Sequence, residues 1–382
     1  MMMNTDIPVK KKRIEVIDAG RGAAMLFVFL SHFAEFYFGY HGKTRLLETV
    51  FNITMIASPS FMLISGSMLG YLYRSNPGGY SRIREKYIDR GLFLLIVAHV
   101  LIFIIMMPYL AYNGHNYKML FITDTIGFSM IAGSWLLPRL RPSLRLVLSA
   151  VLFLASWIAV VELSGSHQHL LFWMEPLTGN LTHQWYDVFP LLPWFALFMS
   201  GTVIGERISV YFHNNQLKDM DKMLLKTAIS VMGVFVFLQV IKTILRIKGL
   251  EVDRGYLGAL LFHGQKNPPG LSYMIFYGGS GLFMLYVLAV MIRRRVLSAF
   301  IDFLRMIGRN SLFVFILQYF FLISLNVLLR PCWTPLWPLL FLSESLMVVL
   351  LTWFWDSKGY NRLLTILHPG VWKEVVFIRK RK

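Results

Sequence analysis

Residues 19–38, AGRGAAMLFVFLSHFAEFYF, are the first of a series of long apolar runs that decide the fold. A run of roughly 18–23 such residues can cross a bilayer as a helix. Comparable runs recur along most of the chain and predict an all-α fold, a polytopic transmembrane helix bundle of about ten spans. The predicted spans are 19–38, 50–73, 91–112, 119–138, 146–163, 188–206, 223–243, 272–292, 310–328 and 334–355.

The composition supports an integral membrane protein. Hydrophobic residues make up 56% of the chain and charged residues 15%, whereas a soluble domain carries about 25% charged residues. Most of the surface must therefore face membrane lipids. The single cysteine, Cys332, excludes an intramolecular disulfide. The first apolar run contains Arg21 and His32 and is followed by no small-residue cleavage site, so we expect a retained helix rather than a signal peptide.

The basic residues indicate orientation. The net charge is +18, but Lys and Arg lie between the apolar runs rather than on a soluble module, so we expect no nucleic-acid partner. With a cytoplasmic N-terminus, 29 of the 38 basic residues fall on the inner side. We therefore expect one membrane domain over 1–382, with a cytoplasmic leader (1–15), a basic cytoplasmic tail (356–382) and both termini inside. The location we expect is the bacterial inner (plasma) membrane, and the sequence leaves open whether the protein is a homodimer.

Ionisable side chains within a bilayer are costly and are candidates for functional roles. Asp18 and Arg21 are one helical turn apart and can pair at the cytoplasmic boundary, which could be their whole purpose. Arg21 and His32 lie on nearly the same helix face, with His32 about 16 Å deeper. His32 alone could equally be a buried histidine that is bonded to a neighbouring helix.

The separation of Arg21 and His32 suits an acyl-coenzyme A, whose phosphates and thioester are about as far apart as 11 helical residues. An arginine at the cytoplasmic mouth can bind phosphate through paired, charge-assisted hydrogen bonds. A histidine near mid-membrane suits a general base because its ordinary pKa is close to neutral pH.

Two segments resemble the membrane-bound acyltransferase family 3. RIEVIDAGRGAAMLFVFLSHF (13–33) has its Arg, ten residues, then His, and SPSFMLISGSMLGYLYR (58–74) is similar to the family's Phe-rich helix with Ser65-Gly66. Three later segments resemble the branch that includes heparan-alpha-glucosaminide N-acetyltransferase. They are FPLLPWFALFMSGTVIGE (189–206), KNPPGLSY with the following GGSG (266–281), and IGRNSLFVFILQYF (307–320).

This resemblance implies an acyltransferase that moves an acyl group, usually acetyl, from cytoplasmic acetyl-CoA to a hydroxyl or amine at the outer face. The implied acceptor is a glycan or lipid-linked sugar of the cell envelope, and O- and N-acetylation both stay open. Carried onto this sequence, His32 and Arg21 would be catalytic, and no metal is expected. Donor binding falls to Arg21, Arg82, Arg84, Lys86 and Arg90, and substrate binding to Asp124, Asn310 and Gln318.

Two departures from the family pattern concern these roles. The arginine pair in the loop after the second span is Arg82-x-Arg84 rather than one separated by two residues. The ninth span has Gln318 and Tyr319 where relatives often have His, which would alter the choice of acceptor more than the type of reaction.

Other polar residues have two interpretations each. Asp124 could meet substrate or cap its helix, and Glu344 could be a structural partner or a functional group. His99 is expected to be a hydrogen-bonded core residue. The Pro268-Pro269 pair and the glycines at 278–281 could break a helix or allow close packing. The outer loops at 164–187 and 244–271 could be connectors or the lip of a substrate site.

A transporter or flippase of a sugar or lipid is the alternative function. Intramembrane charges and helices broken at glycine or proline also occur in that class. Against it, no internal repeat relates one half of the sequence to the other.

Overall fold

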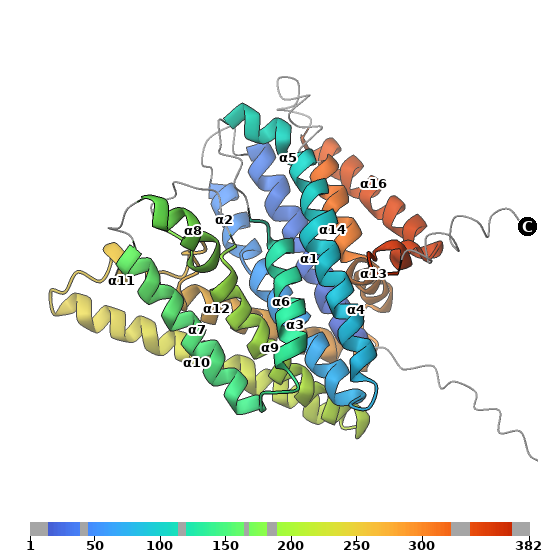
Figure 1. Cartoon of the computed structure of the whole chain (residues 1–382), viewed down its shortest axis with the longest axis horizontal. Helices are drawn as coiled ribbons and strands as arrows, with labels where there is room; N and C mark the ends of the chain where they lie inside the picture. Colours follow the sequence, from blue (N-terminus) through green and yellow to red (C-terminus); the bar gives the residue numbers. More distant parts are fainter. Residues whose placement is uncertain are drawn as a thin grey trace, which may run out of the picture.

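The computed structural model describes residues 14–38, 45–113, 120–163, 168–181, 189–321 and 337–368. Within these ranges the chain forms a bundle of helices without a strand, which confirms the all-α class (Figure 1). Most of the predicted leader, half of the predicted tail, and the end of the ninth predicted span lie outside the described residues. The ten-span count and the cytoplasmic placement of both termini stay predictions.

A helix or a set of consecutive helices coincides with each predicted span. These elements are α1 (Glu15–Phe38), α2 (Arg45–Thr54) with α3 (Ala57–Ser75), α4 (Tyr80–Phe93) with the π-helix η2 (Leu94–Ala98) and α5 (His99–Asn113), α6 (Ile122–Leu136), α7 (Pro142–Leu163), α9 (Leu191–His213), α10 (Leu217–Ile247), α12 (Leu271–Arg294), α14 (Ser311–Tyr319) and α16 (Trp337–Ser357). Among the described residues, seven helical segments are long and apolar enough to cross a membrane. The spans predicted at 119–138, 188–206 and 310–328 are not among the seven, in part because α6 has only 15 residues and the polar residues of α9 lower its hydropathy.

Four further helices of the described residues lie outside the predicted spans: α8 (Gln168–Thr178), α11 (Gly255–Leu261), α13 (Ser298–Arg309) and the 3-10 helix η5 (Tyr360–Leu363). The loops predicted at 164–187 and 244–271 are therefore partly helical. α12 runs unbroken through its glycines, and a Cβ added at Gly281 would collide with Ser60 of α3. The close-packing interpretation of these glycines is the one that the structure supports.

Glycines bring α3 and α9 into backbone contact. A Cβ added at Gly66 or Gly70 of α3 would collide with a backbone carbonyl of α9, and one added at Gly201 or Gly205 of α9 would collide with α3. Each helix thus carries glycines four residues apart, the small-residue spacing that permits close approach of membrane helices. The residue numbers of the contacting positions increase in the same direction along both helices, so α3 and α9 run parallel.

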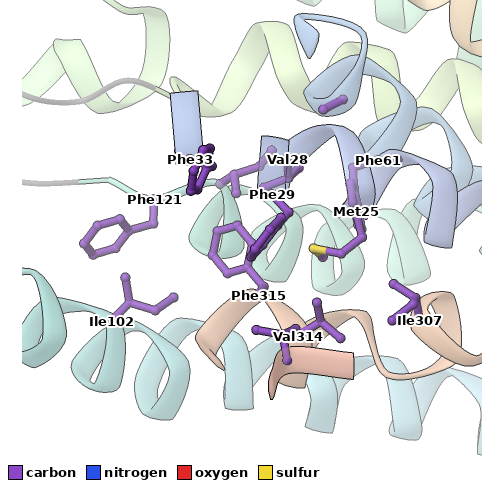
Figure 2. Packing of buried hydrophobic residues seen from close by; sticks show 14 of the residues in the cluster. Met25, Val28, Phe29, Phe33, Phe61, Ile102, Phe121, Ile307, Val314 and Phe315 are labelled. Atoms are coloured by element: carbon purple, nitrogen blue, oxygen red, sulfur yellow. The ribbon is translucent and has the colours of Figure 1, made fainter. Parts of the chain in front are cut away.

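α1 lies inside the bundle against α3, α12, α13 and α14 (Figure 1). Its C-terminal half belongs to an apolar cluster that includes Phe29 and Phe33 of α1, Ile102 of α5, Phe121 before α6 and Phe315 of α14 (Figure 2). These residues come from segments far apart in the sequence, and their packing fixes the position of α1 against α14 and α5.

Candidate functional site

Arg21 and His32 both face α14. Arg21 Nη2 donates a hydrogen bond to Ser311 Oγ at the start of α14, over 2.6 Å. Near the other end, His32 Nε2 lies 3.5 Å from the Tyr319 hydroxyl, a long hydrogen bond. α1 and α14 therefore run parallel, and both polar side chains are turned toward a neighbouring helix rather than toward lipid.

One face of α14 forms the wall opposite these residues. Ser311, Phe315, Gln318 and Tyr319 are spaced i, i+4, i+7 and i+8, which places them on one helical stripe. Gln318 is fully buried, and its Nε2 lies 3.8 Å from Met25 Sδ on α1. Its Oε1 has no hydrogen-bond partner among the described residues, so a polar acceptor atom remains available on this wall.

A second cation lies near Arg21. Arg90 and Tyr87 of α4 interact electrostatically with Arg21, as does Asp18 one turn earlier on α1. Within the described residues, no carboxylate forms an ion pair with Arg21 or Arg90, and Arg21 Nε has no hydrogen-bond partner. Two guanidinium groups brought together in this way can bind an anion such as a phosphate, since Arg offers paired donors to it.

The other predicted donor-binding residues of α4 differ in position. The Arg84 guanidinium stacks over the Trp135 ring of α6, 4.4 Å from the ring centre. Arg82 and Lys86 are exposed. Next to Arg90, the buried Asp89 accepts hydrogen bonds from Thr365 Oγ1 and from the backbone N–H groups of Ile366 and Leu367. The C-terminal segment is thereby held against α4 beside the two arginines.

His32 occupies a largely aromatic setting. Its ring centre lies 4.9 Å from that of Tyr319 and 6.2 Å from that of Phe315. Nδ1 is buried without a hydrogen-bond partner among the described residues. Lys266, which precedes the Pro268-Pro269 segment, interacts electrostatically with His32, and its Nζ lies 5.3 Å from the Phe189 ring centre.

Asp124 caps α6 and binds His99. Its Oδ2 accepts a hydrogen bond from Phe121 N over 2.8 Å and lies 2.9 Å from His99 Nδ1. Asp124 is therefore a helix cap, as one interpretation predicted, and His99 is hydrogen-bonded, as expected. The Oδ1 atom of Asp124 is buried without a hydrogen-bond partner in the described part of the chain. The predicted contact of Asp124 with substrate therefore stays a prediction.

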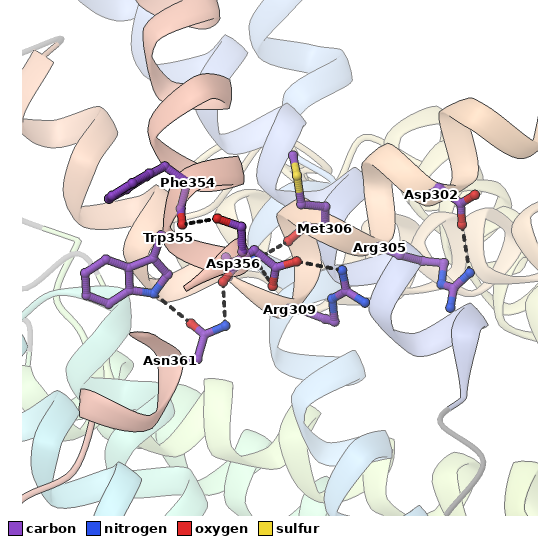
Figure 3. A network of polar contacts seen from close by, with 10 residues as sticks. Asp302, Arg305, Met306, Arg309, Phe354, Trp355, Asp356 and Asn361 are labelled. Atoms are coloured by element: carbon purple, nitrogen blue, oxygen red, sulfur yellow. Dashed lines mark hydrogen bonds and ion pairs between the residues drawn. The ribbon is translucent and has the colours of Figure 1, made fainter. Parts of the chain in front are cut away.

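Asn310 directly precedes α14 and hydrogen-bonds Asp356 near the end of α16. Figure 3 shows the polar network around Asp356, with Arg309 and Asn361. The Asn310 amide donates to Met306 O and Asp356 Oδ1, and its carbonyl oxygen accepts from Asn361. Arg309 pairs with Asp356 over 2.9 Å in the same network. These contacts give Asn310 a structural role close to Arg21 rather than to His32, and its predicted contact with acceptor stays a prediction.

Sequence reasoning did not identify Ser311, Tyr319, Tyr87 or Lys266 as neighbours of the predicted pair. Ser311 and Tyr319 lie in the quoted segment 307–320 and are eight residues apart, which places them on one helical face, but nothing in the sequence assigns that face to α1. Lys266 carries no such signal because it is far from α1 in sequence. No cluster of three or more His, Cys, Asp or Glu suited to a metal ion occurs in the described ranges.

Comparison with known families matches residues 13–238 to the family described as heparan-alpha-glucosaminide N-acetyltransferase, catalytic. The match covers more than half of the 382 residues and includes α1 with Arg21 and His32, α4 with its arginines, and the α3–α9 pair. A search of the curated proteins gives no match. The family and the apolar helices together support an integral membrane acetyltransferase that acts on glycan-type acceptors. The chain belongs to the heparan-alpha-glucosaminide N-acetyltransferase catalytic-domain family.

Proposed function

We propose that this protein transfers an acetyl group from cytoplasmic acetyl-CoA to a hydroxyl or amine of a glycan or lipid-linked sugar at the outer face of the membrane. The observation that carries the proposal is the common orientation of Arg21 and His32 toward one stripe of α14. A donor that enters from the cytoplasmic end would meet cations first and an imidazole about 16 Å further along α1.

The donor's phosphates would bind at Arg21 and Arg90, with Ser311 and Tyr87 as hydroxyl neighbours. Arg82, Arg84 and Lys86 lie on the same helix as Arg90 and would extend the positive surface toward the cytoplasm. The thin pantetheine arm would follow the α1–α14 contact past Gln318, and the thioester would reach His32.

His32 would act as the general base that takes the acceptor's proton as its oxygen or nitrogen attacks the thioester carbonyl. A route in which His32 itself first accepts the acetyl group is the alternative chemistry. Asp124, Gln318 and Lys266 supply polar groups near the outer half of the bundle, where the acceptor would bind.

The test uses purified protein, acetyl-CoA and an amino sugar such as glucosamine. We expect loss of the thioester together with acetylation of the sugar, and the loss of both in His32→Ala. Full transfer by His32→Ala would reject the proposed role of His32. Counterflow of a sugar without any need for acetyl-CoA would instead favour a transporter.

A further inference from the structure

A second imidazole in the bundle is held by a carboxylate. His99 Nδ1 is bound to Asp124 Oδ2 at 2.9 Å, and Asp124 is in turn fixed by the Phe121 backbone N–H. The Asp124 side chain is 3% exposed and that of His99 is 35% exposed. His99 Nε2 forms no hydrogen bond with the described residues, so it is free to accept a proton.

The backbone around His99 is unusual. The π-helix η2 occupies Leu94–Ala98 and ends directly before His99. An extra residue in a helical turn changes the face on which later side chains emerge, and such insertions recur at functional sites. Here the face that follows η2 presents His99 to Asp124 on the neighbouring α6. A buried carboxylate inside an apolar bundle is costly, which also argues for a role beyond packing.

His99 and His32 lie at comparable distances along their helices from the two arginines. Arg21 and Arg90 interact electrostatically, and the positions along the two helices are counted from this pair. Eleven residues further along α1 is His32, and nine residues further along α4 and α5 is His99. At 1.5 Å per residue these steps are about 16 Å and about 13 Å.

The two imidazoles also border the same apolar cluster. The His99 ring centre lies 5.5 Å from that of Phe121, and the His32 ring centre lies 6.2 Å from that of Phe315. Phe121 and Phe315 both belong to the cluster in Figure 2.

Their surroundings suit different tasks. A carboxylate that binds one ring nitrogen fixes the tautomer of a histidine and stabilises the imidazolium, as required of a general base. His99 has such a partner, whereas the described residues place no carboxylate against the His32 ring. His32 is instead an aromatic-lined imidazole at the end of the proposed donor path.

We propose that His99, positioned by Asp124, is the general base of the acceptor half of the reaction, while His32 carries the acetyl group. This inference rests on the proposed function and decides between its two routes. In the first half, a His32 ring nitrogen attacks the thioester carbonyl, the C–S bond breaks, and sulfur leaves with the His32 proton as the CoA thiol. In the second half, the acceptor's oxygen or nitrogen bonds to the acetyl carbon and its proton moves to His99 Nε2. The bond to His32 then breaks, and the released nitrogen recovers the proton from His99.

The experiment measures the two halves separately in full-length protein with acetyl-CoA and glucosamine. Asp124→Asn is the main variant because an amide oxygen can still accept the hydrogen bond from Phe121 N, so the cap is kept and only the charge is lost. His99→Gln removes the base itself. Ser129→Ala is the control on α6, since the buried Ser129 hydroxyl has no partner among the described residues.

We expect both variants to release CoA in the first turnover at the wild-type rate and to accumulate acetylated His32, seen by peptide mass spectrometry. Glucosamine acetylation should fall at least 100-fold, with an unchanged kcat/KM for acetyl-CoA and an unchanged melting temperature. Ser129→Ala should match the wild type.

Wild-type glucosamine acetylation by Asp124→Asn, or reduced acetylation without accumulation of acetyl-His32, would overturn the inference and leave the proposed function standing. A wild-type protein that consumes no acetyl-CoA would overturn the proposed function itself.

Discussion

At the residue scale, the proposed transfer depends most on His32. Replacement of His32 by Ala should lower the rate of acetyl transfer by about 10²–10⁴-fold, the usual contribution of a positioned proton-transfer group or nucleophile. The folded state should persist because, among the described residues, His32 makes a single long hydrogen bond, to Tyr319. Steady-state rates and melting temperature, measured on the same preparation, separate the two effects. A matching drop in melting temperature would point to a packing role.

Arg21 should act on donor binding rather than on chemistry. Arg21→Lys keeps the charge but loses the planar fork that bonds Ser311 and can bind phosphate. One lost charge-assisted hydrogen bond corresponds to about a tenfold rise in KM for acetyl-CoA. Arg82→Lys, at an exposed position on α4, is the control and should change KM little. Equal effects of the two substitutions would mean that diffuse positive charge, rather than the Arg21 geometry, attracts the donor.

The sequence allowed the pair Arg21 and His32 to be predicted because helical periodicity alone places them on one face. It did not allow the partners to be predicted. Arg84 stacks on Trp135, and Lys266 reaches the vicinity of His32, only because helices distant in sequence pack side by side. Contacts of that kind depend on which helices are neighbours, and hydropathy carries no such information.

At the scale of the element, the α3–α9 contact should be intolerant of any side chain at its glycines. Gly205→Leu places atoms where the Ser67 backbone lies, so it should destabilise the protein by about 1–3 kcal/mol or prevent folding. Gly233→Leu on α10 is the matched control, because an added Cβ there meets nothing within 4 Å. Thermal unfolding in detergent compares the two. Equal melting temperatures would show that the helices can separate without loss of stability.

Long apolar helices were predictable from length and hydropathy, whereas the short elements were not. α8 lies in what was expected to be an outer loop, and η2 differs from its α-helical flanks only in hydrogen-bond register. α13 is different, since Phe300, Ile301, Leu304 and Ile307 recur at helical spacing between charged residues. Its amphipathic pattern could have been recognised as a helix that lies along the membrane surface.

At the scale of the whole molecule, contacts between helices agree with the predicted alternation of direction. α1 with α14 and α3 with α9 are parallel, as odd-numbered and even-numbered spans should be, respectively. α10 and α12 are antiparallel, as consecutive spans should be, because Gly279 lies against Met232 and Ser272 against Gln239. Sidedness can be tested in a Cys332→Ser background with a membrane-impermeant maleimide on intact cells.

We expect Glu251→Cys, at an exposed position after α10, to be labelled from outside. Ser81→Cys, at an exposed position in the first turn of α4, should react only after the cells are permeabilised. The reverse pattern would invert the predicted orientation and place the arginines of α4 on the side without acetyl-CoA.

Residues 365–367 of the C-terminal segment occupy the carboxylate oxygens of Asp89 through hydrogen bonds. While these hydrogen bonds are made, the Asp89 carboxylate does not pair with neighbouring guanidinium groups. A protein shortened after residue 363 would keep every long helix but would release this carboxylate next to Arg90. The arginine pair, which already has Asp18 near Arg21, would then have a second carboxylate close by, and a phosphate arriving from the cytoplasm would have to displace it.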